Sequence, residues 1–189
     1  MSVAQPAGRS SGNDQGLGPA QRSAWRLAIY ASVLLWLAMA AGNVVLYSVR
    51  PTGHWPALES VETVQMASLI PIALLLDRMN GGSVASRLVT AVGIAAMLVA
   101  VAIDIGFVTG LVAFGVGPVG GPLFVVDYLI VLAWLFAANA LAARSGTLRR
   151  GLALLGMATA VTATLLYPAW AVWLAREVRG SEGMVRAAE

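Results

Sequence analysis

The chain has 189 residues, of which 59% are hydrophobic and 11% are charged, and its mean hydropathy is +0.79. Soluble domains carry about 25% charged residues, so this composition excludes a soluble globular protein and indicates an integral membrane protein. All 12 basic residues are arginines at the ends of apolar segments, and the net charge is only +3, which argues against a nucleic-acid partner.

Residues 1–22 are rich in Ser, Gly, Gln, Pro and Ala and predict a disordered N-terminal tail. The first apolar segment, residues 27–49, is long enough to span a membrane, since about 20 residues cross the hydrocarbon core. Arginines precede it and residues 38–40 (AMA) resemble a signal-peptide cleavage site. Because the apolar run continues to Tyr47, a retained span is favoured over a cleaved signal.

Four further apolar segments follow, at residues 58–76, 84–112, 123–143 and 152–174. Pro71 falls inside the second of them and predicts a kink there. The sequence therefore predicts an all-α membrane protein: a five-transmembrane-helix bundle over residues 23–176, followed by a polar C-terminal tail over residues 177–189.

Orientation follows from the distribution of arginines, which favour the cytoplasmic side. With the N-terminus in the cytoplasm, five spans place eight arginines on the cytoplasmic side and four on the other side. We therefore expect a multi-pass protein of the cell membrane with a cytoplasmic N-terminus and a C-terminus outside.

Asp104 stands in the middle of an apolar run, IAAMLVAVAIDIGFVTGLV. An acid at the centre of a membrane helix costs about 2.5–3.5 kcal/mol on insertion scales, so it indicates a functional site. Burial without a counter-ion disfavours the charged form, and we expect a protonated Asp104 that can donate a hydrogen bond or a proton. The alternative is a structural acid that hydrogen-bonds to Asn43 or Thr109 and joins two helices.

Because a helix rises 1.5 Å per residue, counting residues from the membrane edge gives the depth of each side chain. On all five predicted helices, polar or aromatic side chains fall at a similar depth, in one layer near the non-cytoplasmic face. We expect this layer to line a ligand pocket. Its predicted catalytic acids are Asp104, Glu62 and Asp127, and its predicted ligand contacts are Asn43, Tyr47, Glu59, Gln65, Tyr128, Tyr167 and Trp170.

Structural explanations compete with several of these assignments. Acids such as Glu59, Glu62 and Asp127 also suit the positive end of a helix dipole. Tyr128, Tyr167 and Trp170 also fit an interfacial aromatic belt. Glycines 106 and 110 have the spacing of a close helix-packing motif, which leaves open a homo-oligomer or packing within the bundle.

The chain has no cysteine and one histidine, His54, and it contains no phosphate-binding, nucleophile-elbow or zinc-protease motif. We therefore expect neither a metal nor a cofactor. The favoured function is a membrane-embedded acid/base isomerase or cyclase of a lipophilic, isoprenoid- or polyketide-like substrate. A small-molecule binding or transport accessory subunit and a structural subunit of a membrane complex remain as alternatives.

Overall fold

The computed structural model describes residues 18–49, 55–112, 124–162 and 165–186, and all regular structure within these ranges is helical. The helices are α1 (Pro19–Val49), α2 (Pro56–Met79), α3 (Val84–Val108), α4 (Phe124–Ser145), α5 (Arg150–Val161) and α6 (Tyr167–Arg186). The first four are long and apolar enough to cross a bilayer, as a multi-pass membrane protein requires. Helix α2 continues through Pro71 without interruption.

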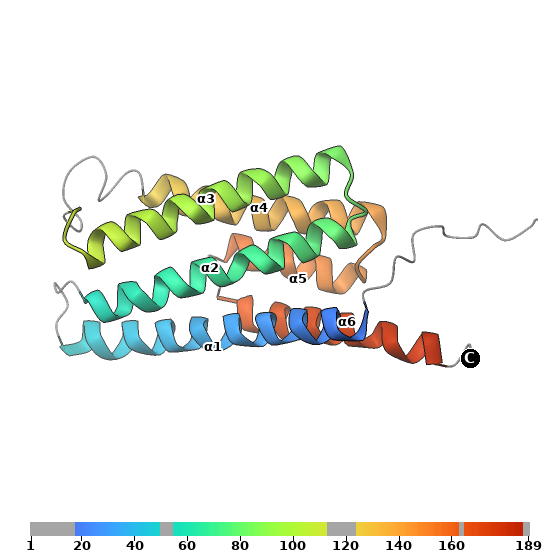
Figure 1. Cartoon of the computed structure of the whole chain (residues 1–189), viewed down its shortest axis with the longest axis horizontal. Coiled ribbons are helices and arrows are strands. Elements are labelled where there is room, and N and C mark those ends of the chain that lie inside the picture. Colours follow the sequence, from blue (N-terminus) through green and yellow to red (C-terminus); the bar gives the residue numbers. More distant parts are fainter. Residues whose placement is uncertain (1–17, 50–54, 113–123, 163–164, 187–189) are drawn as a thin grey trace, which may run out of the picture.

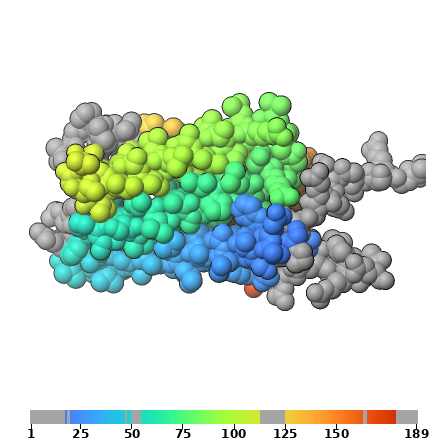
Figure 2. Space-filling view, in the orientation of Figure 1, coloured from blue at the N-terminus to red at the C-terminus, as the bar shows by residue number. Residues whose placement is uncertain are grey.

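The helices pack in two layers. In one layer α1, α2 and α3 lie side by side, and together they form the face seen in Figure 2. Helices α4, α5 and α6 lie behind them (Figure 1), where α4 packs on α3 and α5, and α6 packs on α1. The core between the layers contains fully buried side chains from all six helices, including Ile72, Met97, Leu152 and Leu174.

The predicted fifth span, residues 152–174, is wrong, because this segment forms two helices instead of one. Helix α5 has 12 residues, about 18 Å, which is too short for a hydrocarbon core of about 30 Å. Figure 1 shows α6 turning back alongside α5. An ion pair between Arg149 at the start of α5 and Glu177 on α6, at 3.1 Å, confirms that the two helices are antiparallel.

Proline explains why the segment breaks where it does. Pro168 is the second residue of α6, a position in the first helical turn where the missing N–H costs nothing. Inside a continuous helix the same residue would remove a hydrogen bond and clash with the preceding turn. Two tertiary hydrogen bonds then hold the tip of the hairpin. The hydroxyls of Tyr167 and Ser32 lie 2.6 Å apart, and the Trp170 indole N–H donates to Asn139 Oδ1 at 3.1 Å.

The hairpin also bears on the predicted placement of the termini. The C-terminal end of α6 lies at the same end of the bundle as the N-terminal end of α1 (Figure 1). A cytoplasmic N-terminus with a C-terminus outside is therefore not confirmed, because both helix ends lie at one end of the bundle.

Three helix boundaries differ from those expected. Helix α1 begins at Pro19, inside the predicted tail 1–22, whose first 17 residues lie outside the described ranges. Helix α6 continues to Arg186, so the predicted C-terminal tail is largely helical. Helix α3 ends at Val108 because Gly110 adopts a left-handed conformation (φ +73°), which lets the Val112 N–H reach the Gly106 carbonyl at 3.0 Å.

The two glycines therefore do not form an interhelical packing motif. Gly110 lies outside the helix, and a Cβ on Gly106 would meet the side chain of Val112. Close packing between helices occurs elsewhere. The Trp134 indole of α4 lies against Gly93 of α3, where an added Cβ would clash with the ring, and Asn139 of α4 lies equally close to Gly156 of α5.

Candidate functional site

Charged side chains are segregated between the two ends of the bundle. All arginines in the described ranges lie toward the end that holds Pro19, Met79, Val84 and Ser145, here called the arginine end. At the opposite end, where α1 and α3 finish and α2 and α4 begin, every charged side chain within the described ranges is acidic. We call this the acid end. Arg50 and His54, which precede α2, fall outside those ranges.

Four acids from three helices form the acid cluster: Glu59 and Glu62 on α2, Asp104 on α3 and Asp127 on α4. Their carboxyl groups are near enough for Glu62, Glu59 and Asp127 all to interact electrostatically with Asp104. Glu59 and Asp127 are each 6% exposed, and Glu62 is half-buried. The sequence interpretation that acids from separate spans come together thus agrees with the geometry.

Asp104 is the most buried member of the cluster. Its side chain is 1% exposed, on the face of α3 that also buries Met97 and Phe107. Neither carboxyl oxygen has a hydrogen-bond partner. Asn43 donates instead to the Met39 carbonyl of its own helix, and Thr109 donates to Ile105 and Gly106. The structural alternative, in which Asp104 joins two helices through Asn43 or Thr109, is therefore wrong.

The remaining predicted ligand contacts fall into two groups. Asn43, Gln65 and Tyr128 lie in the half of the bundle that contains the acid cluster, with Gln65 6% exposed and the other two half-buried. The side chain of Tyr47 lies outside the described part of the chain. Tyr167 and Trp170 are in the second group, because they lie at the tip of the hairpin.

Tyr167 and Trp170 do not reach the layer of the acids. Tyr167 is opposite Ser32 of α1, eleven residues before Asn43, which is about 16 Å along that helix. Both side chains are buried in the core, with their ring centroids 5.8 Å apart and their polar atoms hydrogen-bonded to other helices. Their depth was predicted for one continuous fifth helix. Because α5 ends at Val161 and a separate helix begins at Tyr167, that predicted depth does not apply.

A groove between α3 and α4 was not predicted from the sequence. Its outer section has a volume of about 340 Å³ and is lined by Val92, Ala95, Ala96, Val99, Val126, Asp127 and Ile130. A second section of about 330 Å³ shares Val92 and Ile130 and continues past Leu88, Val89, Ala133, Trp134 and Ala137. We call the two sections together the α3–α4 groove. Only the small side chains along α3 and α4 could have indicated it.

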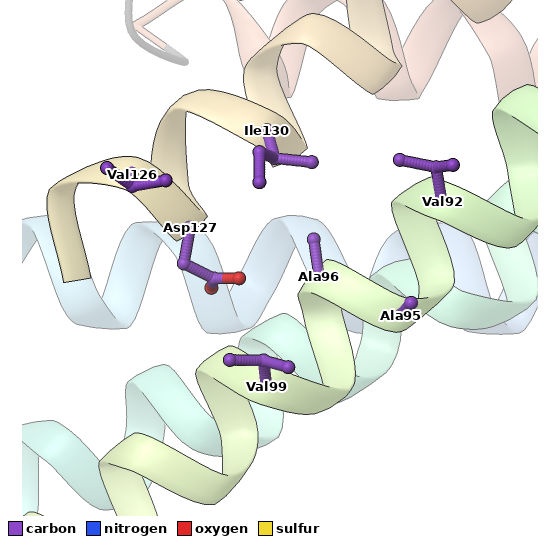
Figure 3. Close-up of a pocket in the computed structure, with 7 residues that line it drawn as sticks. All are labelled: Val92, Ala95, Ala96, Val99, Val126, Asp127 and Ile130. Carbon is purple, nitrogen blue, oxygen red and sulfur yellow. The ribbon is translucent and has the colours of Figure 1, made fainter. Parts of the chain in front are cut away.

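Asp127 joins the groove to the acid cluster. Its carboxyl group points from α4 into the space beside Ala96 and Val99 of α3 (Figure 3), and among the described residues it is the only charged side chain lining the groove. Within the described ranges, no three acidic or histidine side chains are arranged to hold a metal ion.

Comparisons of the chain with protein-family models, curated proteins and solved structures found no match.

Proposed function

We propose that this chain is a multi-pass membrane protein that binds a lipophilic, positively charged small molecule through the acid cluster, with Asp104 at its centre. The observation that carries this proposal is the burial of Asp104 with two unpartnered carboxyl oxygens. A buried carboxyl group without a partner is costly. A bound cation supplies the missing partner, and the neighbouring acids add to its attraction because charges interact strongly in a low dielectric.

Tetraphenylphosphonium is a suitable probe because it is both lipophilic and cationic. We expect saturable binding to the full chain in nanodiscs, measured by equilibrium dialysis, with affinity at least tenfold lower in Asp104→Asn. The matched control is Glu177→Gln, the same carboxylate-to-amide change at the arginine end, which should leave affinity unchanged. Equal affinity in Asp104→Asn and the unmodified chain would refute the proposal, as would the absence of saturable binding.

A second candidate is an acid/base isomerase of a lipophilic substrate. Asp104 and Glu62 interact electrostatically but differ in exposure, and paired carboxyl groups in unequal environments are suited to donating and accepting a proton. Cyclisation through a carbocation is less well supported, because Tyr167 and Trp170 lie in the hairpin core instead of beside the acids. A lipid product that accumulates in cells expressing the unmodified chain, but not Asp104→Asn or Glu62→Gln, would favour the isomerase.

We also propose that the arginine end faces the cytoplasm of a cell whose plasma membrane holds the protein. The hairpin returns the C-terminal arginines to the end that carries the other described arginines. The difference in the number of arginines between the two ends is therefore larger than five spans would give. Cytoplasmic loops are enriched in arginine, which supports this orientation and places the acid cluster toward the outer face.

A further inference from the structure

The α3–α4 groove offers a lateral route between the bilayer and the acid cluster. Along α3 it extends from Val99 to Leu88, which is eleven residues or about 16 Å and about half the thickness of the hydrocarbon core. It lies on the outer surface of the bundle, beside exposed apolar side chains such as Val92 and Val126. A molecule in the groove would therefore contact both the protein and the lipid.

The lining of the groove defines the chemistry of its occupant. Apart from Asp127, every lining side chain in the two sections is Ala, Val, Leu, Ile or Trp. An apolar wall of this length suits a hydrocarbon chain or ring system. Asp127, 6% exposed and directed toward α3 beside Val99 (Figure 3), supplies one negative group at the acid end. A hydrogen-bond-donating cation is the group that complements a carboxylate best.

We propose that the occupant is a lipophilic amine whose protonated amino group pairs with Asp127 and whose hydrocarbon part lies along the groove. This inference rests on the proposed function, since it names the class of cation and its route to Asp104. Among the described residues, the acid end provides no arginine to pair with a phosphate, and four acids would repel one. We therefore expect the site to prefer an amine without a phosphate group over ordinary phospholipids.

The groove and the acid cluster have different roles for this ligand. Val99 precedes Asp104 by five residues, so the carboxyl group of Asp127 meets the amine about 8 Å along α3 from Asp104. Asp104 faces the interior of the bundle, whereas Asp127 lies at the boundary with the groove. The amine thus binds first at Asp127, from the bilayer, and Asp104 is the acid that receives it within the bundle.

Two photoreactive probes test the proposal: a dodecylamine carrying a diazirine at its chain end, and the dodecanol that matches it. The full chain in nanodiscs is irradiated with each probe, and the labelled residues are mapped by mass spectrometry. We expect the amine to label residues 88–99 and 126–137 at least fivefold more than the alcohol. In Asp127→Asn, labelling by the amine should fall to the level of the alcohol.

A second pair of variants separates the groove from other surfaces. Ala95→Trp fills the groove from an exposed position on α3 and should abolish labelling by both probes. Ala67→Trp places the same side chain on an exposed position of α2, away from the groove, and should leave labelling unchanged. Retained labelling in Ala95→Trp would overturn the proposal.

Three further outcomes would each contradict part of the proposal. Equal labelling of the unmodified chain by amine and alcohol would show that charge does not select the occupant, and would overturn the assignment of an amine. Labelling lost in Asp104→Asn but kept in Asp127→Asn would reject Asp127 while leaving the proposed function intact. Protection of the groove from both probes in a protein that crosslinks as a dimer would mean that a second copy covers it.

Discussion

Two buried polar side chains, Asn139 and Asp104, occupy opposite situations in the same bundle. Asn139 is fully buried, donates to the Leu135 carbonyl at 2.8 Å and accepts from the Trp170 indole. Asp104 is almost equally buried and has no hydrogen-bond partner. The first arrangement is that of a structural residue, because its polar atoms are satisfied inside the protein. The second costs stability and therefore indicates a ligand.

Replacing each residue by leucine, which has a similar size and no polar atoms, separates these roles. Asn139→Leu leaves the Trp170 N–H without an acceptor and should lower stability by about 1–3 kcal/mol. Asp104→Leu removes an unpaired acid and should leave stability unchanged or raise it by up to about 3 kcal/mol. Denaturant unfolding in detergent measures both. A comparable loss in the two variants would mean that Asp104 is structural.

The hairpin of α5 and α6 determines where the acid cluster can form. It fills the bundle between α4 and α1 at the arginine end, and its tip is fixed by contacts to Ser32 and Asn139. Among the described helices, only the four long ones, α1 to α4, continue toward the acid end. The acids of α2, α3 and α4 therefore lie beyond the hairpin, in the part of the bundle with the fewest helices.

Cysteine labelling tests the hairpin directly, because the natural chain has no cysteine. Single cysteines at Arg150 and Arg176, both exposed, should react with a water-soluble maleimide from the same side of the membrane. A cysteine at Leu165, 71% exposed at the tip of the hairpin, should react from neither side, because it faces lipid. Labelling of positions 150 and 176 from opposite sides would restore a continuous fifth span.

The sequence predicted the four long helices because hydropathy and length alone define a membrane span. It also predicted the approach of Glu62, Asp104 and Asp127, since depth in a straight helix follows from counting residues. It failed for residues 152–174, which are apolar enough to span but are divided near Pro168. The packing of Trp134 on Gly93 and the groove beside it depend on how two helices meet, and a linear pattern does not contain that information.

At the scale of the whole molecule, the separation of charge gives the bundle a direction. The arginine end carries the basic side chains of four helix termini and of the hairpin, whereas the described side chains of the acid end carry only carboxylates. A positive end retained in the cytoplasm leaves the acids facing outward, where a cationic amphiphile in the outer leaflet can reach Asp127 without crossing the membrane.

This orientation predicts the behaviour of reporter fusions. A fluorescent protein that matures only in the cytoplasm should fluoresce when it is fused before Met1 or after Glu189. Alkaline phosphatase, which is active only outside, should be active when inserted between α3 and α4 and inactive at both termini. The physical reason is that α5 is too short to span and α6 returns beside it, so a topology of four complete spans would bring the chain back to the side on which it began. Phosphatase activity after Glu189 but not before Met1 would contradict the hairpin, whereas activity at both termini would reverse the orientation and leave the hairpin intact.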